Sequence, residues 1–265
     1  MNRKFASIIA QTLQPNLAWV EELHWRRTLT LAVISFFGLA LYGFTVGYWR
    51  SPVMGLYVAV KMPALIVCTL GCNALLNGLL GVLCNTGLGF RQSLMALLWA
   101  FAVAAILLGS VAPITFFLAW NAPSPQAGNA GVAHAAYLLA HTALIACAGI
   151  FSNIHLHRLL ASKATNRSAA TLTLFSWLAG NGLLGAQFSW ILRPFFGSPT
   201  LDVAFLREHP FEGTFYESVW SSIQAITGGH GALWGALIAI LSLIIGAKIF
   251  VDSKHQTTTS TTKSI

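Results

Sequence analysis

Six long runs of apolar residues set the pattern of hydrophobic and polar positions along this chain. They cover residues 28–48, 62–82, 93–117, 133–151, 171–192 and 232–250. An α-helix needs about 20 apolar residues to cross the hydrocarbon core of a bilayer, and each run is close to that length. The pattern therefore predicts an all-α protein, a polytopic transmembrane helical bundle with six spans.

Cations and prolines mark where these runs begin and end. Arg27 precedes the first run, and Lys61 with Pro63 introduces the second, so we expect Lys61 to lie at the membrane surface. The fifth run is followed by Arg193 and Pro194. Proline restrains the residue before it away from the helical conformation, which predicts that the fifth helix ends close to Leu192.

The rest of the chain divides into a leading segment, an outer loop and a tail. Residues 1–27 predict an N-terminal interfacial segment, because an amphipathic stripe recurs at helical spacing in Phe5, Ile8, Ile9 and Leu13. A disordered terminus is the alternative. Residues 28–250 form the six-span membrane domain and include the outer loop at 193–231. Residues 251–265 are rich in Thr and Ser, which is typical of a disordered C-terminal tail.

The scarcity of charge agrees with a lipid-covered surface. Only 8% of the residues are charged, against about 25% in soluble domains. With six spans and an inner amino terminus, eleven Lys and Arg residues fall on the inner side and four on the outer side. This excess favours two cytoplasmic termini in a bacterial cell (inner) membrane. The net charge of +8 is scattered rather than striped, so we expect no nucleic acid as a partner.

A few polar side chains lie within the apolar runs. They are Asn73, Asn77, His134, His141, Asn181 and Gln187. Asn73 and Asn77 are four residues apart among glycines, as in a packing seam where amides bond between close helices. The other interpretation is an intramembrane polar path for a solute. His134 and His141 share one helix face but lie roughly 10 Å apart along the axis, too far to bind one metal ion together.

The outer loop is the one sizeable segment outside the membrane. Phe211 to Ile226 shows amphipathic spacing and predicts a helix at the outer surface. Its carboxylates could dock the loop onto the bundle by pairing with Arg193; they are Asp202, Glu208, Glu212 and Glu217. In this hypothesis Phe195, Phe196 and Trp220 are buried beneath the loop. The alternative is a solvated arginine that reaches toward lipid phosphates.

We identify no catalytic, cofactor-binding or metal-binding residues in the sequence. The four cysteines include no second pair at metal-ligand spacing. The Gly-x-Ser-Gly turn of rhomboid-type proteases is absent, and Arg193-Pro194 and Gly229-His230 match only fragments of the lipid-phosphate phosphatase pattern. We therefore expect no cofactor.

Four motifs resemble a family of uncharacterised bacterial multi-pass inner-membrane proteins. They are Leu41-Tyr42-Gly43, Ala59-Val60-Lys61-Met62-Pro63, Phe90-Arg91-Gln92 and the stretch from Gly185 to Pro199, which reads Gly-x-Gln-x-x-Trp-x-Leu-Arg-Pro-Phe-x-Gly-Ser-Pro. The resemblance covers about residues 40–225. It implies a helical inner-membrane bundle and supplies no catalytic residues.

Three functional hypotheses follow. The first is a non-enzymatic integral membrane scaffold or accessory subunit, which uses its outer loop to bind a membrane-protein partner or a second copy of itself. The second is a facilitative transporter or channel for a small solute. The third is a membrane-interface enzyme that uses Arg193, His209 and His230 near the carboxylates of the outer loop. We favour the first, because we expect no charged side chain well inside a span.

Overall fold

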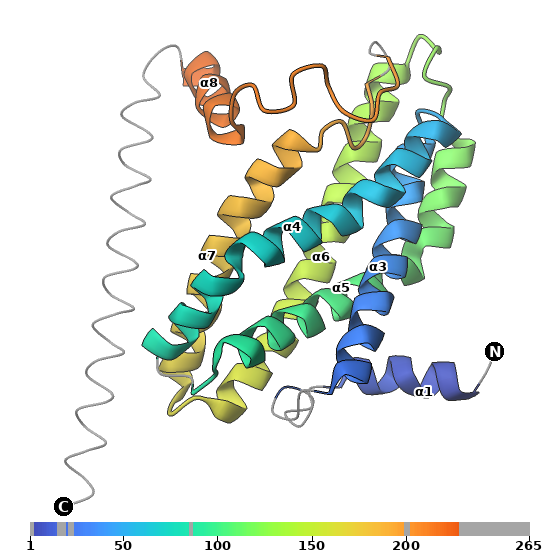
Figure 1. Ribbon diagram of the computed structural model, residues 1–265. Helices are drawn as coiled ribbons and strands as arrows, with labels where there is room; N and C mark the ends of the chain where they lie inside the picture. The colour runs from blue at the N-terminus through green and yellow to red at the C-terminus, as the bar shows by residue number, and fades with distance from the viewer. Residues whose placement is uncertain (1–2, 15–19, 21–23, 85–86, 199–201, 228–265) are drawn as a thin grey trace, which may run out of the picture.

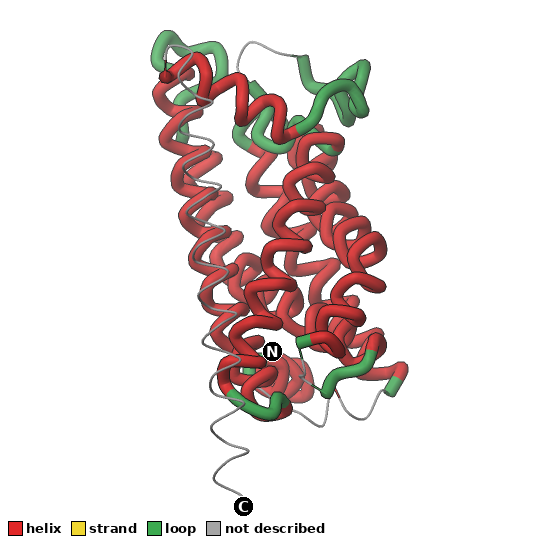
Figure 2. Tube along the Cα trace, turned by 90° about the vertical axis from the view of Figure 1, so that its left-hand side faces the viewer, coloured by secondary structure: helices red, strands yellow, loops and turns green. Residues whose placement is uncertain are grey.

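The computed structural model describes residues 3–14, 20, 24–84, 87–198 and 202–227, and these residues form helices and loops without a strand. The helices are α1 (Arg3–Thr12), α3 (Trp25–Tyr48), α4 (Pro52–Leu83), α5 (Phe90–Asn121), α6 (Ala130–Lys163), α7 (Arg167–Ile191) and α8 (Phe215–Thr227). The long helices run beside one another and the loops gather at the two ends (Figure 2). We call these the α1 end, crossed by α1, and the loop end, where α8 lies (Figure 1).

Four of the described helices are long and apolar enough to cross a membrane: α3, α4, α5 and α6. The chain is therefore a membrane protein. The fifth predicted run forms α7, a 25-residue helix that is not among these four. It ends at Ile191 with Leu192 as its C-cap, as the Arg-Pro pair predicts. The sixth run, 232–250, and the tail, 251–265, lie outside the described residues.

Helix α4 begins ten residues before the predicted start of the second span, which corrects the expected position of Lys61. The Ser51 hydroxyl accepts a hydrogen bond from the Met54 amide over 3.0 Å, and Pro52 occupies the first turn. Serine caps and early prolines both favour helix initiation. Lys61 and Pro63 consequently lie inside a 32-residue helix rather than at its entrance.

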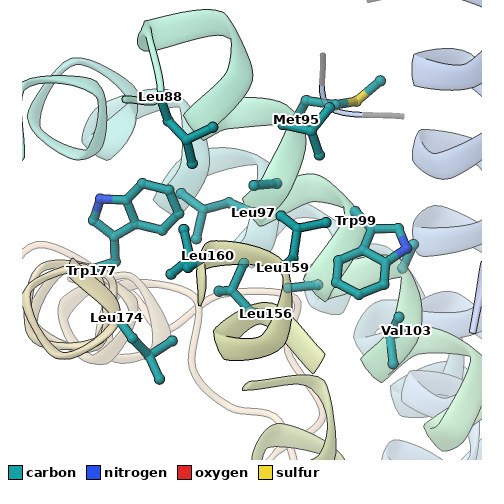
Figure 3. Packing of buried hydrophobic residues seen from close by; sticks show 14 of the residues in the cluster. Leu88, Met95, Leu97, Trp99, Val103, Leu156, Leu159, Leu160, Leu174 and Trp177 are labelled. Atoms are coloured by element: carbon teal, nitrogen blue, oxygen red, sulfur yellow. The ribbon is translucent and has the colours of Figure 1, made fainter. Parts of the chain in front are cut away.

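The core at the α1 end joins residues of α3, α4, α5, α6 and α7. Leu156, Leu174, Trp99 and Trp177 belong to one buried cluster (Figure 3). The Trp99 indole nitrogen donates to the Thr12 carbonyl oxygen over 2.8 Å. The predicted helix at the amino terminus is thus present, and its carboxyl end is fixed to α5.

At the loop end, α3 and α4 pack closely. A Cβ atom on Gly43 would lie only 2.7 Å from the Val58 carbonyl oxygen. Small residues let membrane helices approach in this way. Tyr42, beside this glycine, is buried in a second hydrophobic cluster with Met54 and Val58. This tight crossing fixes the position of α4, and therefore of Lys61, relative to α3.

Candidate functional site: a loop anchored inside the bundle

Lys61 holds the chain segment that follows α7. From Pro52 to Lys61, α4 rises about 14 Å along its axis. The Lys61 side chain is 0% exposed, and its amino group donates to the Pro194 carbonyl oxygen over 2.7 Å. A charged group in this position is costly unless it has partners. The bond joins the candidate span to the long loop, which we define as residues 193–214.

Aromatic rings complete the surroundings of the Lys61 amino group. Its nitrogen lies 5.9 Å from the ring centroid of Phe195 and 5.1 Å from that of Phe205. A cation near an aromatic face gains electrostatic stabilisation, and more so away from water. Both rings belong to the long loop, so the loop encloses the cation that binds it.

A second cation, Arg50, holds the next turn of the loop. Its Nε donates to the Ser198 carbonyl oxygen over 2.9 Å. Gly197 beside it has a φ of +67°, and a Cβ there would lie 2.8 Å from the Arg50 Cγ. Glycine is the residue that adopts this conformation readily and leaves this space. The sequence Phe-x-Gly-Ser thus fits a turn pressed against Arg50.

Phe196 enters the bundle on the other side of the loop. Its ring centroid is 5.9 Å from that of His141 on α6. His141 is buried, and its Nδ1 shares a hydrogen bond of 2.7 Å with the Tyr42 hydroxyl. Phe195 and Phe196 both pack against the cluster that contains Tyr42. Both phenylalanines, which were predicted to be buried, are half-buried against this cluster.

Two of the four histidines of α6, His134 and His141, lie on the face that meets α3 and its C-cap residue Trp49. His141 lies beside Tyr42, and His134 stacks on Trp49 with ring centroids 5.3 Å apart. Between them Tyr137 donates to the Thr45 carbonyl oxygen. Because α3 and α6 run in opposite directions, Tyr42 meets His141, and Trp49, seven residues after Tyr42, meets His134, seven residues before His141. The two histidines therefore pack aromatic side chains, and His134 Nδ1 has no hydrogen-bond partner among the described residues.

Arg193 does not form the predicted ion pair. Its guanidinium carbon lies 3.5 Å from the ring centroid of Trp190, and its Nη1 donates to the Trp190 carbonyl oxygen over 2.6 Å. No described carboxylate lies within ion-pair distance of it. Partial burial and the charge of Arg207 lower the pKa of Arg193, and Glu212 opposes this shift. Arg193 therefore contacts the Trp190 indole instead of the predicted carboxylate.

Helix α8 begins four residues later than predicted, because a capping box sets its start. The Thr214 hydroxyl accepts from the Glu217 amide over 3.1 Å, and the Glu217 carboxylate accepts from the Thr214 amide over 3.0 Å. This reciprocal pair satisfies helix amides that otherwise lack partners. Trp220 is 38% exposed on α8, so its predicted burial beneath the loop is wrong.

The long loop presents charged side chains around a cleft of about 520 Å³. Asp202, Glu208 and Glu212 line it together with Arg193, Arg207 and His209. Phe211, next to this cleft, is 80% exposed. Of the residues in the enzyme hypothesis, His209 and Arg193 share the cleft, and His230 lies outside the described residues.

The amides divide into a seam and one separate residue. Asn77 donates to the Asn181 side-chain oxygen over 3.3 Å, and its own carbonyl accepts from the Trp177 indole over 2.9 Å. Asn73 lies within the same seam, 3.5 Å from the Asn77 oxygen. Gln187 instead accepts from the Phe215 amide over 3.2 Å and so holds the start of α8. The histidines contact α3, so the six polar residues do not form one continuous path.

Lys61, Arg50 and Tyr42 are the site residues that sequence reasoning missed. The Ser51-Pro52 pair was the available signal for Lys61, because it marks the true start of α4. The partners of all three residues are distant in the chain, and no local pattern indicates them. Within the described ranges, no group of three or more His, Cys, Asp or Glu residues could hold a metal ion.

Comparison of the chain with protein-family models, with curated proteins and with solved structures finds no match. The interpretation of this site therefore rests on its own geometry.

Proposed function

We propose that this chain is a non-enzymatic membrane scaffold or accessory subunit that binds a membrane-protein partner through its long loop. The observation that carries the proposal is the hydrogen bond from Lys61 to the Pro194 carbonyl oxygen. An ionisable residue inside a membrane helix usually serves function. Here that residue fixes the position of the loop, and the loop is the element that reaches beyond the bundle.

The surface of the long loop has the chemistry of a docking site. From Asp202 to Glu217 the chain carries four carboxylates against one arginine, and all four carboxylates belong to exposed residues. Exposed Phe211 supplies an aromatic anchor of the kind that dominates binding energy at interfaces. A complementary partner offers an apolar pocket ringed by Lys or Arg. A second copy of this loop would bring like charges together, so we favour a different protein.

We further propose six spans, with the α1 end in the cytoplasm of a bacterial cell. The basic residues at that end support this orientation under the positive-inside rule: Arg26, Arg27, Arg91, Arg158, Lys163 and Arg167. Reporter fusions after Lys254 and within residues 202–208 should report opposite compartments. The same compartment for both fusions would mean that the run 232–250 does not cross.

A facilitative transporter for a small solute is the second candidate, favoured by the position of Lys61 inside a candidate span. Transport pathways keep their ionisable residues in such positions. The two candidates separate in proteoliposomes, where small-solute flux that disappears in Lys61→Met, with the loop still protected from protease, would support transport.

The scaffold proposal is tested by purification in mild detergent and identification of co-purifying chains. Phe211→Ala should release a partner that wild type retains. Phe151→Ala, which removes an equally large exposed ring from the membrane-facing surface of α6, should retain it. Equal retention by both variants would contradict docking through the loop.

A further inference from the structure

A cavity of about 300 Å³ lies between α4, α5, α6 and α7. Its wall includes Leu156, Leu174 and Trp177 from the buried cluster of the α1 end (Figure 3). A groove of about 670 Å³ runs along α6 and α7 beside it. Cavity and groove share Asn153, Leu174 and Leu178, so they lie next to each other along α6 and α7.

Three polar side chains on the cavity wall donate to carbonyl oxygens of their own helices. Thr69 donates to the Leu65 carbonyl oxygen over 2.8 Å. Ser152 and Asn153 donate to the Gly149 carbonyl oxygen over 3.0 and 2.8 Å. The Thr69 and Ser152 hydroxyls have thereby used their one donor each, and most other residues on the wall are apolar. The space therefore suits an apolar chain.

The dimensions of the groove match one leaflet of a bilayer. It extends along α6 from Ala146 to Arg158, a rise of about 18 Å. Half of the hydrocarbon core is about 15 Å thick. One acyl chain entering from the α1 end would follow the groove over this depth.

Arg158 places a positive charge at the end of the groove. Arg158 lines it, is exposed, and makes no hydrogen bond or ion pair with any residue that the structure describes. The carboxylates of the described residues lie at the opposite end, in the segment Asp202–Glu217. Basic pockets between membrane helices bind anionic lipid headgroups.

From these observations we propose that the groove between α6 and α7 binds an anionic phospholipid, with its phosphate at Arg158 and one acyl chain directed toward the cavity. This site needs no protein partner and is independent of the scaffold proposal.

Native mass spectrometry with phosphatidylglycerol and phosphatidylcholine of the same acyl chains tests the site. Wild type should retain phosphatidylglycerol in preference to phosphatidylcholine. Arg158→Gln should weaken phosphatidylglycerol binding by about fivefold, the effect expected for one basic residue at a membrane surface. Arg91→Gln, which removes a basic residue at the start of α5, is the matched control and should retain the preference.

A variant that fills the groove distinguishes the binding of a lipid, which needs the groove for its acyl chain, from the binding of a free phosphate ion. A Cβ on Gly149 meets no atom within 4 Å, so Gly149→Leu can fold and place its side chain in the groove. It should abolish retention of phosphatidylglycerol, whereas Gly71→Leu, at an equally open glycine on α4, should not. Equal retention by Gly149→Leu and Gly71→Leu, or no preference for phosphatidylglycerol in wild type, would overturn the proposal.

Discussion

The amino group of Lys61 on α4 donates a hydrogen bond to the carbonyl oxygen of Pro194, 133 residues further along the chain, over 2.7 Å. The rings of Phe195 and Phe205 lie around the same amino group. A buried charge is tolerated when such partners replace its water. This contact therefore fixes the long loop to the interior of the bundle.

Replacing Lys61 with methionine should release the loop. Lys61→Met keeps the bulk of the side chain but leaves the Pro194 carbonyl oxygen without its donor. We expect faster amide hydrogen exchange in residues 193–198 and unchanged exchange in the core of α5. Val60→Met, on the exposed face of the same turn, is the control. Unchanged exchange in Lys61→Met would mean that the loop is held by other contacts.

The phenolic hydroxyl of Tyr42 should stabilise the bundle through His141. Tyr42→Phe removes the 2.7 Å hydrogen bond and keeps the ring. We expect the free energy of unfolding in detergent to fall by about 1 kcal/mol or more, because the buried imidazole loses its partner. Tyr48 contacts aromatic rings, and its hydroxyl makes no hydrogen bond with the residues that the structure describes, so Tyr48→Phe should change little. Equal losses in both variants would argue against a specific role of the bond to His141.

The amide seam should behave as one unit. Asn77→Leu and Asn181→Leu each remove the 3.3 Å hydrogen bond between α4 and α7, and each should lower the free energy of unfolding by about 1 kcal/mol. The double variant should lose less than the sum of the two, because the bond is lost only once. Full additivity would show that the two amides do not interact.

Arg193 should depend on Trp190 and not on Glu212. Its guanidinium lies over the Trp190 ring, an interaction worth about 0.5–1 kcal/mol at exposed sites. In double-mutant cycles measured by thermal unfolding, Arg193→Gln should couple to Trp190→Leu. Its effect should be additive with that of Glu212→Gln. Coupling to Glu212→Gln, without coupling to Trp190→Leu, would instead support the predicted ion pair between Arg193 and Glu212.

The periodicity of apolar residues predicted most of the helices, because lipid and core impose the same apolar requirement on long helices. It misplaced the start of α4, because Lys61 and Pro63 resemble a helix entrance when their partners are unknown. The bond to Pro194 joins residues that are distant in sequence and follows only from how α4 and α7 pack. The local signal for the true start of α4 was the helix-capping pair Ser51-Pro52.

The same limit applied to the candidate site. The shared face of His134 and His141 followed from their spacing of seven residues, whereas the facing residues on α3 could not be predicted. Asn73 and Asn77 were grouped correctly with Asn181. Gln187 was grouped with them because it is polar, but it lies further along α7 and binds the Phe215 amide instead.

Site-specific photocrosslinking from position 211 in intact membranes tests the central claim most directly. Phe211 is 80% exposed, so a photoreactive residue there should crosslink to one discrete partner protein. In the Lys61→Met background this adduct should weaken strongly, because the released loop no longer holds position 211 in place. A probe at Leu139, an exposed apolar position on α6, should give the same products with and without Lys61. An adduct from position 211 of equal yield in both backgrounds, or none at all, would contradict a docking loop held by Lys61.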